Sequence, residues 1–178
     1  MKNAKPLIIP RKTAKQQRSK AMVEAILEGA ARVLVRMGYD KASTNKIAET
    51  AGVSIGSLYQ YFPTKESIVA ALIEKHILLE TEQMQKKIQD LENEKAEIIL
   101  QKFVQFVMGL WGKNKTLRRV FIEQVPQIGK SKSVYQYEDK IGSQLYLVLL
   151  NSLNQKIPQD FELRSFIVTK SIMGVIRS

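Results

Sequence analysis

The sequence predicts an all-α protein, and two observations carry this prediction. Apolar residues recur at steps of three and four along almost the whole chain after residue 14, which is the period of an amphipathic helix. The alternation of apolar and polar residues that marks a strand is absent, and there is no internal repeat. With 178 residues, 44% of them hydrophobic, the chain suits one compact unit or a small domain joined to a larger one.

The first predicted helix starts near residue 14 and ends at a glycine. Gly38 is a C-terminal stop, because glycine readily takes the left-handed conformation that ends many helices. Residues 39–41 then form a short link. Gly29 costs about 1 kcal/mol relative to alanine inside a helix, so we expect close packing there. The apolar face consists of Ile26, Ala30, Val33, Leu34 and Met37.

Two short helices follow, joined by a tight turn. Ser43 or Thr44 can cap the first, since a hydroxyl accepts hydrogen bonds from the free amides at a helix start. Ser54 can cap the second, and Pro63 ends it, because the residue before proline avoids the helical conformation. The buried residues of the two helices are Ile47, Ala48, Ala51, Leu58, Tyr61 and Phe62, with Gly52, Val53 and Ser54 in the turn.

The sequence after Pro63 predicts one long helix and four further helical blocks. Thr64 caps the long helix, and Glu66 lies in its first turn, where the helix dipole favours an acid. Its apolar stripe continues toward Leu91. The later blocks span about 95–111, 117–124 and 134–153, and the last begins near residue 160.

Composition excludes several kinds of site and protein. The absence of cysteine removes disulfides, thiolate metal sites and cysteine nucleophiles. No paired acids, phosphate loop or nucleophile–base arrangement is present, so we expect no enzyme and no cofactor. The single histidine, His76, is a poor metal site by itself, and a place at the surface or at a domain interface is expected. Without a signal-peptide core or a membrane-length apolar run, a soluble cytoplasmic protein is the expectation.

The positive charge is concentrated in the first third of the chain. The net charge is +11. Residues 1–65 hold twelve basic and four acidic side chains, a net of +8, and leave +3 for the rest. Such an excess favours polyanionic partners. Residues 1–13 are predicted to be a basic flexible arm along phosphates or in a minor groove; the alternative is a solvated tail.

The segment from Ser43 to Phe62 has the spacing of a helix-turn-helix. Ala48 is small enough to let two helices cross closely, Gly52 permits the turn, and Val53 fills the space beneath it. The second helix can then enter the major groove with its N-terminal residues against base edges. Plain helical hairpins share this spacing, but the charge placement favours DNA binding.

The same residues resemble the tetracycline-repressor (TetR) family over roughly residues 14–75. The resemblance rests on four segments, which are Gly38–Tyr39, Ile47–Ser54, Gly56–Phe62 and Lys65–Glu66. It implies an all-α dimer with a three-helix DNA-binding domain, here residues 14–65, joined by a long helix to a helical effector-binding and dimerisation domain, residues 66–178.

The resemblance also implies roles for individual residues. Base-facing positions are Asn45, Ile55, Gly56, Ser57 and Gln60, while phosphate-facing positions are Ser43, Thr44, Tyr59, Tyr61 and Lys65, with Ser54 also at the DNA. Tyr61 can serve the core as much as DNA. Asparagine can bond adenine bidentately, whereas Gly56 offers only its backbone. With so few long polar side chains, sequence choice is expected to depend partly on DNA shape and the basic arm.

The second domain is expected to hold a cavity for a small, largely apolar effector and a dimer interface in its last helices. The candidate lining residues are Phe103, Phe106, Val107, Leu110, Trp111 and Phe121, although each can be ordinary core. Tyr135 and Tyr137 can offer hydroxyls to a ligand or lie at the surface, and no clustered charges indicate a strongly ionic effector. Because the sequence stops inside an amphipathic pattern where the family usually adds a helix, a truncated or incompletely represented chain is expected.

The function these features predict is a sequence-specific transcriptional regulator, most often a repressor in this family, that binds double-stranded operator DNA as a homodimer. The main alternative is an architectural DNA-binding protein without sequence preference, which would bind random and operator DNA equally. An enzyme using the second domain lacks a catalytic constellation, and a membrane-surface protein lacks a suitable helix.

Overall fold

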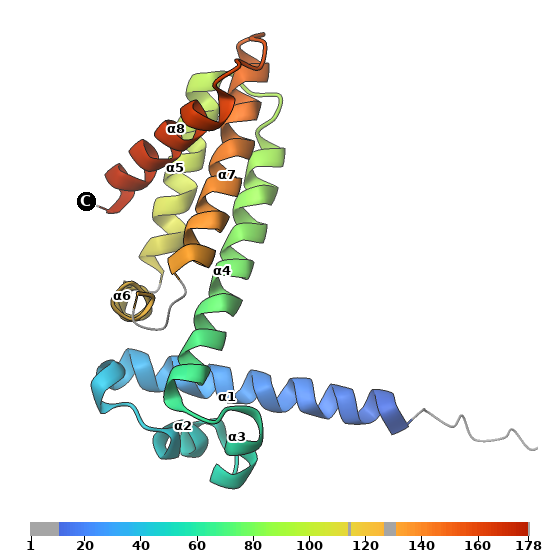
Figure 1. Cartoon of the computed structure of the whole chain (residues 1–178), viewed down its shortest axis with the longest axis vertical. Helices are drawn as coiled ribbons and strands as arrows, with labels where there is room; N and C mark the ends of the chain where they lie inside the picture. Colours follow the sequence, from blue (N-terminus) through green and yellow to red (C-terminus); the bar gives the residue numbers. More distant parts are fainter. Residues whose placement is uncertain (1–10, 114, 127–130, 178) are drawn as a thin grey trace, which may run out of the picture. The chain divides into compact units, whose positions relative to one another are not determined.

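The computed structural model describes residues 11–113, 115–126 and 131–177, with side chains in 16–113, 115–126 and 136–174. These residues contain helices and no strand, which confirms the all-α prediction. The helices are α1 (Arg11–Lys41), α2 (Thr44–Ala51), α3 (Ile55–Tyr61), α4 (Lys65–Asp90), α5 (Ala96–Gly112), α6 (Lys115–Gln124), α7 (Ser131–Ser152) and α8 (Phe161–Arg177), as drawn in Figure 1.

The chain divides inside α4 into two compact units. The first unit ends at Leu72, and the second starts at Ile73. The boundary expected after residue 65 separates a DNA-binding domain from an effector-binding and dimerisation domain. The division at Leu72 reflects packing alone, so this functional boundary stays a prediction. None of the described helices combines the length and apolar character needed to cross a membrane.

The first unit begins with α1, which is interrupted near its end. Gly38 has φ 75° and ψ 175°, so it breaks the helix, and the stop predicted there is confirmed. The short link predicted for residues 39–41 is wrong, because these residues form a last helical turn after the break. Of the predicted basic arm, residues 1–10 lie outside the described residues, and Arg11–Thr13 already belong to α1.

Close packing of α1 against α2 forms the core of this unit. Ile26, Leu34 and Ile47 are fully buried there. Gly29 lies where a Cβ atom would come within 2.8 Å of the Ala51 Cβ and 2.9 Å of the Ala51 amide nitrogen. The close packing expected at Gly29 is therefore confirmed, and it explains why a poor helix former stands inside the helix.

The second unit is a bundle of the later part of α4 with α5, α6, α7 and α8. Its core cluster comprises Ile88, Leu91, Ile99, Phe103, Val107, Ile141, Leu145, Val148 and Leu149. The boundaries predicted for α5, α6, α7 and α8 agree with the structure within three residues.

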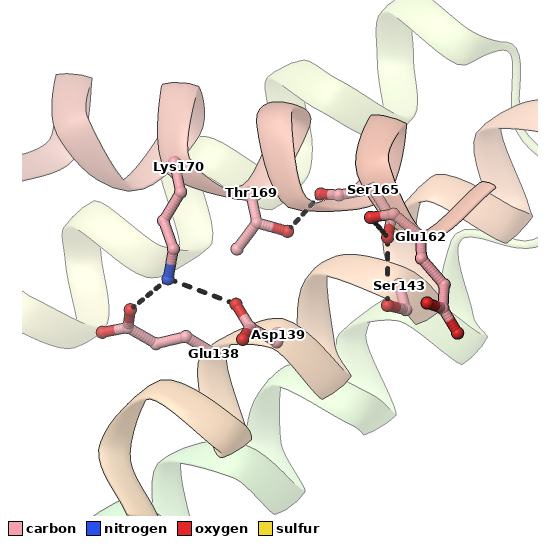
Figure 2. A network of polar contacts seen from close by, with 7 residues as sticks. All are labelled: Glu138, Asp139, Ser143, Glu162, Ser165, Thr169 and Lys170. Carbon is pink, nitrogen blue, oxygen red and sulfur yellow. Dashed lines mark hydrogen bonds and ion pairs between the residues drawn. The ribbon is translucent and has the colours of Figure 1, made fainter. Parts of the chain in front are cut away.

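Helices α7 and α8 lie side by side and meet through small and polar residues (Figures 1 and 2). A Cβ atom on Gly142 would lie 1.5 Å from Thr169 Oγ1, so only glycine allows this approach. Ser143 Oγ donates to Ser165 Oγ at 3.3 Å, and Thr169 Oγ1 donates to the Ser165 carbonyl at 2.6 Å. Lys170 Nζ lies 3.4 Å from Glu138 Oε2 and 3.2 Å from Asp139 Oδ1 across the two helices.

Candidate nucleic-acid interface and cavity

The two helices from Thr44 to Tyr61 have the geometry of a helix-turn-helix. Ser43 is the N-cap of α2, and its side chain accepts a hydrogen bond from the Lys46 amide. Gly52 has φ 69° and ψ 30°, a left-handed conformation that favours glycine. The Val53 amide donates to the Ala48 carbonyl at 3.0 Å and closes the turn. The cap predicted at Ser43 and the turn predicted at Gly52 are confirmed.

Helix α3 has one buried and one exposed face. Leu58 is fully buried and Phe62, its C-cap, is nearly so. The opposite face is exposed and carries Ile55, Gly56, Tyr59 and Gln60. The fold thus leaves accessible four of the residues predicted to meet DNA, which is the arrangement that a recognition helix requires.

Two of the predicted DNA residues also hold the start of α3 together. The Ser54 side chain caps the helix by accepting from the Ser57 amide at 3.0 Å. Its hydroxyl also donates to Ser57 Oγ at 2.8 Å. Their hydroxyls therefore have a structural role in addition to the one predicted at the DNA.

A hydroxyl pair joins the two helices. Thr44 Oγ1, in the first turn of α2, lies 3.0 Å from the Tyr59 hydroxyl on α3. Both residues are predicted phosphate contacts, and the fold brings them together although they are far apart along the sequence. Asn45, the next residue of α2, is exposed, and Tyr61 is half-buried, as its alternative core role suggests.

Lys65 at the start of α4 is bound to the end of α1. Its Nζ donates to the Tyr39 carbonyl at 3.1 Å and lies 4.0 Å from the centroid of the Tyr39 ring. The Tyr39 hydroxyl in turn donates to Glu66 Oε1 at 3.1 Å. Burial and the bond to Glu66 raise the pKa of Tyr39. This cluster gives Lys65 a positioning role that the sequence pattern did not reveal.

Two further basic side chains have contacts that sequence reasoning missed. Arg32 donates from Nη2 to the Thr50 carbonyl at 3.1 Å and joins α1 to α2. Lys46 Nζ donates to the Lys41 carbonyl at 3.1 Å. The charge count located the positive excess in residues 1–65, but only the folded backbone identifies which carbonyls these cations bind.

The second unit contains a partly open cavity of about 820 Å³. Five of the six predicted lining residues are in its wall, namely Phe103, Val107, Leu110, Trp111 and Phe121. Phe106 is not in the wall: its side chain packs against the core cluster, with Lys87 Nζ 5.9 Å from the ring centroid. Tyr137 also lines the cavity, whereas the Tyr135 side chain lies outside the described residues.

Charged side chains also line this cavity, contrary to the absence of clustered charges in the sequence. Arg118 Nη2 donates to Glu80 Oε1, and the Arg118 guanidinium carbon lies 4.2 Å from the centroid of the Trp111 ring. Burial raises the pKa of Glu80 although Arg118 opposes the shift. Glu138 and Lys113 line other parts of the wall.

His76 is half-buried in the cavity wall and not at the surface. Its ring meets the Phe121 ring edge-on, with centroids 5.1 Å apart. Within the residues that the structure describes, no group of three or more histidines and carboxylates is placed to hold a metal ion. His76 therefore contributes its ring, in contact with Phe121, to the cavity wall.

Helix α8 carries an exposed apolar face on the second unit. Leu163, Phe166 and Ile167 are 59%, 48% and 53% exposed. Their spacing of three and four places them on one side of the helix. Large apolar side chains grouped on one helical face are typical of a surface that meets another protein.

Comparison with known families identifies the N-terminal part of the chain. Residues 26–72 match the family model described as "Bacterial regulatory proteins, tetR family". This match contains α2 and α3 and ends at the division between the two units.

Curated relatives align with the same part. The fatty acid metabolism regulator protein of Bacillus subtilis is 34% identical over 86 residues, 48% of this chain and 43% of that protein. The HTH-type transcriptional repressor AcnR of Corynebacterium diphtheriae is 39% identical over 49 residues, 28% of this chain and 26% of that protein. The matched regions thus span less than half of either relative.

Similarity in fold extends over more of the chain. The transcriptional regulator FadR from Bacillus subtilis, solved in complex with stearoyl-CoA, has a TM-score of 0.60 and 21% identity, covering 86% of this chain and 84% of that one. At this identity the likeness concerns the fold of both units.

Proposed function

We propose that this chain, which belongs to the TetR family of bacterial regulatory proteins, acts as a dimeric repressor that a small molecule releases from its operator. The chain is a DNA-binding transcriptional regulator. The observation that carries the proposal is the helix-turn-helix whose recognition helix buries Leu58 and exposes Ile55, Tyr59 and Gln60. A cavity in a separate compact unit provides a place for the effector.

We assign recognition of the operator bases to two polar side chains and one apolar side chain. Asn45 and Gln60 can bond base edges bidentately, and Ile55 can contact a thymine methyl. Ser43, Thr44, Tyr59, Tyr61 and Lys65 are assigned to phosphates, which set the register on the duplex without reading its sequence.

Dimerisation is assigned to the α8 face formed by Leu163, Phe166 and Ile167. Burial of these side chains against a second copy removes apolar surface from water, and a two-fold contact uses the same face on both copies. Two recognition helices would then enter successive major grooves about 34 Å apart. Replacing Phe166 with serine should shift the protein toward monomer in sedimentation equilibrium.

Release of the operator DNA follows from the preference of the effector for one conformation of the dimer. A ligand that binds better to a dimer with wider spacing of its recognition helices lowers DNA affinity by that preference alone. The stearoyl-CoA complex of the Bacillus subtilis regulator supports an effector with a long apolar part, which matches the mostly apolar wall of the cavity.

The test is selection of bound fragments from genomic DNA with the full chain, followed by affinity measurements on variants of the selected operator. Asn45→Ala and Gln60→Ala should each reduce discrimination between operator and mutated operator by about tenfold, within the range of 1–3 kcal/mol for a bidentate base contact. Gln101→Ala, an exposed glutamine on α5, is the matched control. Unchanged relative affinities for both variants would contradict direct readout, and equal affinity for random DNA would favour the architectural alternative.

A further inference from the structure

The cavity wall is mostly apolar, and one ion pair with an aromatic neighbour interrupts it. Glu80 on α4 and Arg118 on α6 are bonded to each other, and Trp111 on α5 lies against the guanidinium. All three residues line the cavity. About one fifth of each charged side chain is exposed, 22% for Arg118 and 23% for Glu80. The pair is therefore half-buried at the cavity wall and not a surface pair.

The geometry orients the arginine. Its guanidinium carbon lies over the Trp111 ring, 4.2 Å from the centroid, and its Nη2 donates to Glu80, so two contacts restrain the group. A restrained guanidinium presents its N–H groups as a fixed fork, which suits a planar or tetrahedral anion better than a lysine would.

We propose that Arg118 is the head-group anchor of this cavity, and that the effector is an amphiphile whose anionic head replaces the Glu80 carboxylate on the guanidinium while its apolar body fills the cavity. This inference rests on the proposed function of the cavity as the effector site. The ligand is defined by shared chemistry, an apolar body with a single carboxylate or phosphate head.

The environment of the pair favours exchange of an anion over binding of a cation. Arginine stays protonated at any physiological pH, so it cannot give up its charge. Glu80 can take up a proton, and burial makes this easier because it raises the pKa of the carboxyl group. Uptake of a proton by Glu80 leaves the guanidinium to the incoming anion and keeps the number of buried charges unchanged. A cationic ligand would instead add a charge beside Arg118.

Trp111 provides the measurement, because it is the single tryptophan of the chain and touches the proposed anchor. The probes are dodecanoate, dodecyl phosphate, dodecan-1-ol and dodecylammonium, titrated below their micelle concentrations into the full chain without DNA. Binding is followed by tryptophan fluorescence and by calorimetry. We expect at least one of the anions to bind about tenfold or more tightly than the alcohol, since hydrogen bonds to charged groups are the stronger class.

Arg118→Met should abolish this preference while leaving the affinity for the alcohol unchanged. The matched control is Arg119→Met, the adjacent residue of α6, whose side chain is 83% exposed and pairs with Glu123. The control should keep the preference. If Arg118→Met also loses its affinity for dodecan-1-ol, the deciding variant is Glu80→Gln, which removes the competing carboxylate. Tighter binding of the anions to Glu80→Gln supports the exchange, and weaker binding overturns it.

Equal affinity for anion and alcohol in the unchanged protein would overturn the inference, as would tighter binding of dodecylammonium. The two anions distinguish a carboxylate ligand from a phosphate one. Because binding is measured without DNA, the outcome is separable from the proposed function. A protein that binds dodecanoate through Arg118 but does not release its operator would contradict the proposed release and leave the anchor intact.

Discussion

A cation over an aromatic ring occurs in both units, and the two shortest described examples, one in each unit, have different partners. In the first unit Lys65 Nζ lies 4.0 Å from the Tyr39 ring centroid and donates to a backbone carbonyl. In the second, the Arg118 guanidinium carbon lies 4.2 Å from the Trp111 ring centroid and pairs with a carboxylate in a cavity wall. The distances are nearly equal, so the difference between the two sites comes from their surroundings.

The comparison teaches what the partner does to a charge. Lys65 is partly buried and donates to an uncharged carbonyl, so it can share or leave this partner for a phosphate without leaving a second charge behind. In the cavity wall, weaker screening strengthens the attraction between Arg118 and Glu80 and also the penalty for leaving either without a partner. The first site is suited to exchange with a polyanion, and the second to selecting one ligand.

The largest expected effect is on stability. Arg118→Met should lower the free energy of unfolding by about 1–3 kcal/mol, because Glu80 is left half-buried without its ion-pair partner. Lys65→Met should cost less, about 1 kcal/mol, because its hydrogen-bond acceptor is an uncharged carbonyl and no buried carboxylate loses its partner. Denaturant unfolding followed by circular dichroism and Trp111 fluorescence measures both. Equal losses would break the contrast between the two environments.

A smaller effect concerns the salt dependence of DNA binding. Lys65→Ala should weaken binding to all sequences alike and reduce the slope of log K against log salt by about 1, the value for one lost phosphate contact. Lys86→Ala removes the same charge from an exposed position later on α4 and should leave the slope unchanged. A loss confined to one operator sequence would show that Lys65 acts through the shape of the helix-turn-helix.

The smallest expected effect is on the pH dependence of stability. Burial raises the pKa of Glu80 in the folded protein above 4.5, so the folded state binds this proton more tightly than the unfolded chain. The resulting stabilisation is present below the unfolded pKa and is lost as pH rises through the folded one. Relative to Glu80→Gln, the unchanged protein should therefore become less stable as pH rises above 4.5, and an opposite trend would show that Arg118 outweighs burial.

How much the sequence could predict differs between the two units for a physical reason. The helix-turn-helix lies within a short segment, where caps, a left-handed glycine and helical spacing are local properties, so Ser43, Gly52 and Ser54 were placed correctly. The cavity depends on which helix faces meet. Glu80 and Arg118 are 38 positions apart, and nothing local to either indicates the other.

Phe106 and His76 illustrate the same limit. Apolar character alone cannot distinguish a residue that lines a cavity from one that packs in the core beside it, and Phe106 is of the second kind. A solitary histidine carries no pattern that indicates a cavity wall, where its ring meets Phe121. In both cases the answer depends on the rotation of α4 and α5 about their axes, which periodicity determines only approximately.

The hydrogen bond between the Thr44 and Tyr59 hydroxyls leaves one hydroxyl hydrogen of the pair unused. Two hydroxyls hold two hydrogens, and the bond between them uses one, whichever oxygen donates. One O–H is thus always left to point elsewhere. A phosphate oxygen accepts hydrogen bonds and donates none, so the pair can meet it in either of its two internal arrangements. The pair can therefore reverse its own hydrogen bond without losing its complementarity to the DNA backbone.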